Sequence, residues 1–188
     1  MAETLVSTDY PFERYSSQRN YYAFDFLPGS RDVIYSANTS GQFNIWRQTP
    51  PTRSSLGTAT QLTGFDEWTV RFMEPLPDGR SIVTFADKDG DENYQIFRVD
   101  TRDGWQSPLV MKPGVRNTFG IDCVSPNGRL AAYASNERLP GDMDIVLTSI
   151  TTRQTRPVLA DGAVYEFGRW SPDGRFATIL EDLSTDDY

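Results

Sequence analysis

Oxygen-bearing side chains alternate along Asp87–Asn93, and this stretch is the chain's best candidate for binding a cation. An EF-hand loop shows a similar alternation, but it also needs glycine at its sixth position and a bidentate glutamate at its twelfth. Here the glycine is fourth, at Gly90, and the twelfth position is Arg98. The stretch is therefore expected to be a solvated hairpin loop and not a metal site.

The residue types that usually carry catalysis are largely missing. The chain has no histidine, which excludes a Ser-His-Asp or Cys-His nucleophilic site and any His-ligated metal within it. Its one cysteine, Cys123, excludes an internal disulfide and a thiolate zinc site, and its apolar flanks predict a buried structural thiol. There is no Gly-x-Ser-x-Gly elbow. We expect no catalytic residues, no metal and no cofactor in this chain.

Charged loop residues are the remaining candidates for a functional site. Glu92, Glu137 and Arg138 lie in two loops that occupy equivalent places in an internal repeat. Loops at one face of a repeat architecture often contact a substrate or a neighbouring domain, so these three residues are predicted to do so. Ordinary exposed charged loops are the alternative.

The repeat is marked by a tetrapeptide that begins with proline and ends with arginine. It occurs at residues 28–31, 77–80, 126–129 and 172–175, with its arginines 49, 49 and 46 residues apart. Proline, then Asp or Asn, then glycine suits a tight turn, whereas the first copy, Pro-Gly-Ser-Arg, predicts a different turn type. The period matches a four-stranded propeller blade.

Short apolar, β-prone runs surround each turn, and no helical periodicity is found. Four strands per repeat predict an all-β fold, a β-propeller of about three and a half four-stranded blades in an incomplete ring. The expected blades are residues 21–65, 66–114, 115–162 and an incomplete 163–188, after an N-terminal lead-in at 1–20. The runs after the turns are almost continuously apolar, so both faces of each blade are expected to be covered.

One position of the repeat carries mostly polar residues. Asp25, Glu74, Cys123 and Arg169 each lie six residues before the arginine of their turn, in the strand expected to be innermost. They are predicted either to face a central channel or to form ion pairs between blades.

Charge and hydropathy limit the partners. With 18 basic and 26 acidic residues the net charge is −8, and no basic cluster is present, so nucleic acid is not an expected partner. No apolar run is long enough to span a membrane, and the first residues do not resemble a secretion signal, so a cytoplasmic location is expected.

Several motifs resemble a known group of proteins. The sequence Trp-Ser-Pro-Asp-Gly-Arg at 170–175 resembles the signature shared by TolB-like propellers and the N-terminal domains of prolyl oligopeptidase-family serine peptidases. Residues 86–97 are similar to a second-blade segment of acylaminoacyl-peptidase-like and dipeptidyl-peptidase-like members. Residues 119–120, 125–129 and 134–138 resemble their third blade. The resemblance covers about residues 20–188.

The resemblance implies a non-catalytic propeller that gates or positions peptide substrate for an α/β-hydrolase domain beyond Tyr188. None of that family's catalytic positions is found in this chain. A TolB-like protein-binding scaffold remains an alternative, as does a half-propeller completed by dimerisation.

Overall fold

The computed structural model describes residues 18–183, which form strands and turns with no helix. The first sheet has the order β1 (Tyr21–Phe26), β2 (Val33–Ala37), β3 (Asn44–Gln48), β4 (Ala59–Gln61). The second has the order β5 (Trp68–Pro75), β6 (Ser81–Lys88), β7 (Gln95–Asp100), β8 (Gln106–Val110). The third blade comprises β9 (Asn117–Val124), β10 (Leu130–Ser135), β11 (Asp144–Ser149) and β12 (Thr155–Leu159).

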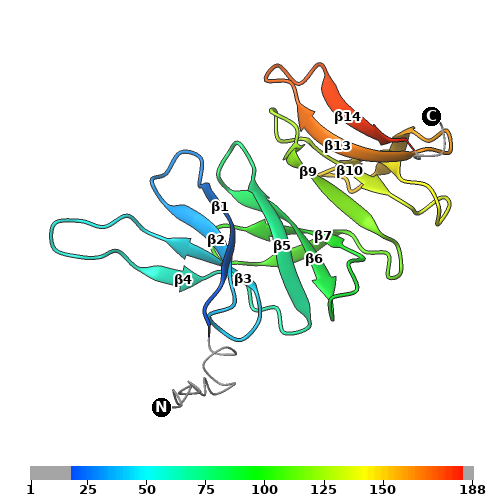
Figure 1. Ribbon diagram of the computed structural model, residues 1–188. Coiled ribbons are helices and arrows are strands. Elements are labelled where there is room, and N and C mark those ends of the chain that lie inside the picture. The colour runs from blue at the N-terminus through cyan, green and yellow to red at the C-terminus, as the bar shows by residue number, and fades with distance from the viewer. Residues whose placement is uncertain (1–17, 184–188) are drawn as a thin grey trace, which may run out of the picture.

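A half-blade of two strands, β13 (Val164–Trp170) and β14 (Ala177–Asp182), follows the third blade. Its inner strand β13 meets β9 through one parallel bridge, between Arg169 and Asp122, so six strands form one continuous sheet. The blades succeed one another as an open arc (Figure 1). The predicted all-β incomplete propeller is confirmed. The expected lead-in lies mostly outside the described residues, as do residues 184–188.

The middle strands show why their sequences are almost continuously apolar. Successive residues of a strand point to opposite faces of the sheet. In β6, Ile82 and Ala86 pack in the cluster between blades 1 and 2, while Val83 and Phe85 pack in the cluster between blades 2 and 3. The interface between two neighbouring blades is called a seam below. The two seams of blade 2 thus receive alternate residues of the same strand, β6.

The expectation of two covered faces is wrong for the last run, residues 176–180. Every residue of β14 is exposed, and Phe176 precedes the strand with 67% of its surface accessible. Of the described residues, none pairs with the free edge of β14. In blade 3 the outer strands β11 and β12 continue the sheet beyond β10, and the half-blade has no equivalent of these two strands.

The turns interlock the blades. Gly79, with φ +66°, stands where an added Cβ would lie 2.2 Å from the carbonyl oxygen of Pro28 in the preceding turn. A Cβ at Gly128 would lie 3.2 Å from Pro77, and one at Gly174 would lie 3.4 Å from Pro126. The glycine of each turn therefore supplies both a left-handed backbone and room for the proline of the preceding blade.

The first turn differs, as its sequence predicts. The amide of Ser30 donates to the carbonyl of Leu27, and Gly29 at the third turn position has φ +73°, which is the geometry of a type II turn. In the second turn the amide of Gly79 closes the loop by donating to the carbonyl of Leu76. The residue with positive φ is therefore Gly79 at the fourth turn position, and not the residue at the third.

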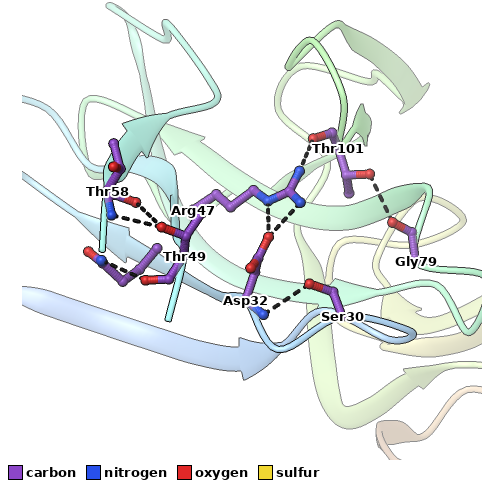
Figure 2. Close-up of polar contacts among 8 residues, drawn as sticks. Ser30, Asp32, Arg47, Thr49, Thr58, Gly79 and Thr101 are labelled. Atoms are coloured by element: carbon purple, nitrogen blue, oxygen red, sulfur yellow. Dashed lines mark hydrogen bonds and ion pairs between the residues drawn. The ribbon is translucent and has the colours of Figure 1, made fainter. Parts of the chain in front are cut away.

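A polar contact also ties blade 1 to blade 2 (Figure 2). Arg47 on β3 donates from Nε to Asp32 at 2.6 Å and from Nη1 to the carbonyl of Thr101 at 3.3 Å. The hydroxyl of Thr101 donates to the carbonyl of Gly79 at 2.8 Å, which joins the contact to the interlocking turn.

Replacing Arg47 with methionine should cost about 1 to 2 kcal/mol of unfolding free energy, because Asp32 loses its cationic partner while the side-chain stem remains. Urea unfolding would measure this loss. Arg98→Met is the matched control, since Arg98 is the equivalent residue of blade 2 and bonds Ser81 within its own blade. An equal loss in both variants would contradict a specific role for Arg47 between blades.

Candidate functional site

The polar position of the repeat lies on the inner wall of the arc and links three blades. The carboxylate oxygen Oε2 of Glu74, on β5, accepts the backbone N–H groups of Cys123 at 2.7 Å and of Val124 at 3.0 Å, both on β9. The carbonyl of Cys123 accepts the indole N–H of Trp170 on β13 at 3.1 Å. Cys123 is thus bound by its backbone to blade 2 on one side and to the half-blade on the other.

The next seam uses an ion pair at the same level. Arg169 on β13 lies 3.3 Å from Asp122 on β9, and both side chains are about half exposed. Of the two roles open for the repeated position, Glu74 and Arg169 therefore form contacts between blades. Asp25 instead accepts the neighbouring amide of Phe26 at 2.6 Å.

Burial changes the acidity of the two groups that meet at the seam between blades 2 and 3. Burial raises the pKa of Glu74 to about 7, although hydrogen bonds from Cys123 and Val124 act in the opposite direction. Burial also raises the pKa of the Cys123 thiol, and the neighbouring negative charge of Glu74 acts in the same direction. The predicted buried structural thiol is confirmed, because Cys123 has no exposed surface.

Two adjoining hollows open beside this contact. One, of about 590 Å³, lies along β1, β5 and β9, and the other, of about 350 Å³, lies along β5, β9 and β13. They share Glu74, Pro75, Pro77 and Asp122, so they form one groove along the inner wall, called the inner groove below.

Exposed apolar side chains line the inner groove. Phe24 is 82% exposed, Ile121 69% and Phe26 68%. The groove also contains the carboxyl groups of Asp25, Glu74 and Asp122. Apolar surface with a few polar groups is the usual lining of a binding site.

The three loop residues predicted as a site lie elsewhere, at the loops between the second and third strands. Glu137 pairs with Lys112 of the preceding blade. Glu92 is 3.9 Å from Arg116, whose amide donates to the side chain of Asn136 at 2.8 Å. The structure thus connects the two loops through the segment between blades 2 and 3, but neither loop lines the inner groove.

Arg138 is held by acidic side chains of its own blade. Its guanidinium makes two hydrogen bonds to Asp144, at 2.8 and 2.9 Å, and one to Asp142 at 2.6 Å. Arg138 and Glu137 border a hollow of about 340 Å³, together with Lys112 and Asp144. The cation of Arg138 is therefore already neutralised, and a role for these loop residues toward substrate stays a prediction.

The stretch that resembles a calcium loop does form a hairpin between β6 and β7. Asp87 differs from the expected solvated position, because it lies at the end of β6, is fully buried and pairs with Arg71 at 2.8 Å. Asp91 accepts the amide of Asn93 at 2.9 Å, a local turn contact. Within residues 18–183 no three His, Cys, Asp or Glu side chains are grouped as metal ligands.

The contacts of two further residues were not found by sequence reasoning. Asp122 and Trp170 lie one residue from the repeated position, at Cys123 and Arg169, and Trp170 was identified only as the first residue of the signature at 170–175. Their partners come from other blades, 47 residues away in each case.

Comparison with known proteins supports the fold. No protein-family model matches the chain, and no curated protein matches its sequence. Among solved structures, TolB from Acinetobacter baumannii is similar with a TM-score of 0.64 and 16% identity, over 88% of this chain and 39% of that one. An oligogalacturonate lyase from Vibrio parahaemolyticus has a TM-score of 0.65 and 10% identity, over 92% of this chain and 50% of that one.

A structure from a study of two prolyl endopeptidases has a TM-score of 0.63 and 12% identity, over 88% of this chain and 26% of that one. The chain therefore spans about a quarter to a half of the length of these proteins. At such low identity the likeness establishes the propeller fold and nothing about activity.

Proposed function

We propose that this chain is the non-catalytic propeller segment of a prolyl oligopeptidase-family serine hydrolase, and that it gates or positions peptide substrate for an α/β-hydrolase domain. The observation that carries the proposal is the inner groove, where exposed Phe24, Phe26 and Ile121 stand beside carboxyl groups. Apolar side chains of an extended peptide would pack against Phe24, Phe26 and Ile121. Basic side chains of the same peptide would pair with the carboxyl groups. Prolyl endopeptidase and the tricorn protease are among the proteins of similar fold.

A TolB-like scaffold that binds another protein is the second candidate. Two TolB structures are among those of similar fold, and the Ser-Pro-Asp-Gly-Arg motif at 171–175 suits both groups. In that case the inner groove would bind a segment of a partner protein, and no hydrolase domain would be required.

Both ends of the arc need a cover under either proposal. At the first blade, Tyr21 and Tyr22 are more than 60% exposed, and at the half-blade Leu180 is 57% exposed. Further blades would bury these side chains in the first two candidates. A homo-oligomer, in which two copies complete one ring, is the third candidate.

We place the protein in the cytoplasm in the hydrolase case. Among the described residues no helix is long and apolar enough to span a membrane.

The reading frame beyond Tyr188 and the intact mass of the natural gene product separate these candidates. The hydrolase proposal predicts further repeats, a Gly-x-Ser-x-Gly elbow and a later histidine, and labelling of one serine by a fluorophosphonate probe. Further repeats without an elbow and without labelling would favour the scaffold. A product that ends at Tyr188 would contradict the hydrolase proposal, and a dimer in light scattering would then favour the completed half-propeller.

A further inference from the structure

We propose that Glu74 is a pH-dependent latch between blades 2 and 3: its protonated carboxyl group holds the seam closed, and its ionisation weakens that seam. This goes beyond the proposed function, since it concerns the stability of the arc and requires neither a substrate nor a second domain. The inference rests on the position of one carboxyl group between two inner strands.

The hydrogen bonds leave one oxygen of Glu74 available for a proton. Both backbone donors, the amides of Cys123 and Val124, bind the same oxygen, Oε2. A proton on Oε1 therefore leaves both bonds between the blades in place. A neutral carboxyl group also avoids the cost of an anion in a partly buried seam.

Apart from the two backbone amides, which favour the anion, no positively charged group in the described part of the chain compensates the charge of Glu74. On β9 it faces the carboxylate of Asp122 and the thiol of Cys123. On β13, Arg169 borders one of the hollows that Glu74 lines, but it is paired with Asp122. On β1, Asp25 borders the same hollow. Over residues 18–183, no lysine or arginine forms an ion pair with Glu74.

The raised pKa of Glu74 agrees with this geometry, and it implies that the folding stability depends on pH. The pKa of Glu74 rises from an ordinary 4.5 to about 7 in the folded chain, chiefly through burial. Between these values the folded state keeps a proton that the unfolded state has lost. Stability must therefore fall as the pH rises from about 4.5 to about 7, and level off above. Because the chain has no histidine, no imidazole titrates in this window.

Urea unfolding of the 188-residue chain at pH 5, 6, 7 and 8 tests the latch. For the native sequence, the folded-to-unfolded ratio should fall on the order of 10- to 100-fold between pH 5 and pH 8. Glu74→Gln should abolish this fall, since the amide oxygen can accept both backbone bonds and carries no charge. Asp25→Asn, which removes a carboxylate that borders the same hollow and, among the described residues, is bonded only to its neighbouring amide, should retain most of the fall.

A flat profile for the native sequence, or an unchanged fall in Glu74→Gln, would overturn the proposal. A Glu74→Gln chain that does not fold would also overturn it, because that side chain mimics the protonated acid. The thiol of Cys123 gives a second readout as the only cysteine, buried in the seam. At pH 8, iodoacetamide should modify it several-fold more slowly in Glu74→Gln than in the native sequence. Equal rates would contradict loosening of the seam.

Discussion

Replacement of Gly79 by alanine should lower the unfolding free energy by about 2 to 4 kcal/mol. About 1 kcal/mol comes from placing a side chain in the left-handed region, where Gly79 has φ +66°. About 1 to 3 kcal/mol more comes from overpacking, because the new Cβ would lie 2.2 Å from the carbonyl oxygen of Pro28. Relief requires blade 1 and blade 2 to separate. Chemical denaturation of the purified chain would measure the loss.

Gly90 provides the matched control for this prediction. It also has a positive φ, +76°, but an added Cβ there would have no atom within 4 Å. Gly90→Ala should therefore cost only the conformational part, about 1 kcal/mol. If Gly79→Ala cost no more than Gly90→Ala, the close approach of the two turns would not be a feature of the folded chain.

Truncation of Phe85 to alanine should lower the unfolding free energy by about 3 to 5 kcal/mol. Phe85 is fully buried in the seam between blades 2 and 3. Its ring lies 5.4 Å from that of Phe119, 5.8 Å from that of Phe72 and 6.3 Å from that of Tyr133. A cavity there would loosen aromatic packing on both sides of the seam.

Phe24→Ala removes the same side chain from the inner groove, where Phe24 is 82% exposed. Its unfolding free energy should stay within about 0.5 kcal/mol of the native value. The midpoint and the slope of the urea transition, measured together, would separate lost stability from a change in the amount of surface exposed. Equal losses in the two variants would contradict the assignment of Phe85 to a core seam.

Local sequence rules were sufficient for the strands and turns. The tetrapeptides at 77–80, 126–129 and 172–175 predict hairpins because proline and glycine restrict or permit the required backbone angles, and all three hairpins are present. The type II geometry at Gly29 follows from the order of two residues.

Burial of a strand was harder to predict, because it depends on what lies beside the strand. The runs in β6 and β14 are similarly apolar, yet β6 is buried almost throughout and β14 is exposed throughout. The difference comes from the neighbouring sheets, which cover both faces of β6 and leave both faces of β14 exposed. An apolar sequence pattern indicates that a strand favours burial, but it does not show whether a neighbouring sheet is present to bury it.

The candidate site depended on contacts between distant residues. The repeat placed Glu74 and Cys123 at one equivalent position, but it left open whether they face a channel or each other's blade. That choice depends on the register of β5 against β9, across 49 residues of chain. The contact of Arg47 with Thr101 across 54 residues had no sequence signal either. The loop residues Glu92, Glu137 and Arg138 remain a prediction.

The central claim is that consecutive repeats are neighbouring blades, each locked to the one before it by its turn glycine. Nuclear Overhauser contacts between the α protons of these glycines and the preceding prolines test it most directly. The account predicts contacts of Gly79 with Pro28, of Gly128 with Pro77 and of Gly174 with Pro126, as the close approaches in the structure require. Absence of all three contacts, or contacts between turns that are not consecutive, would contradict the blade order and the propeller arc built on it.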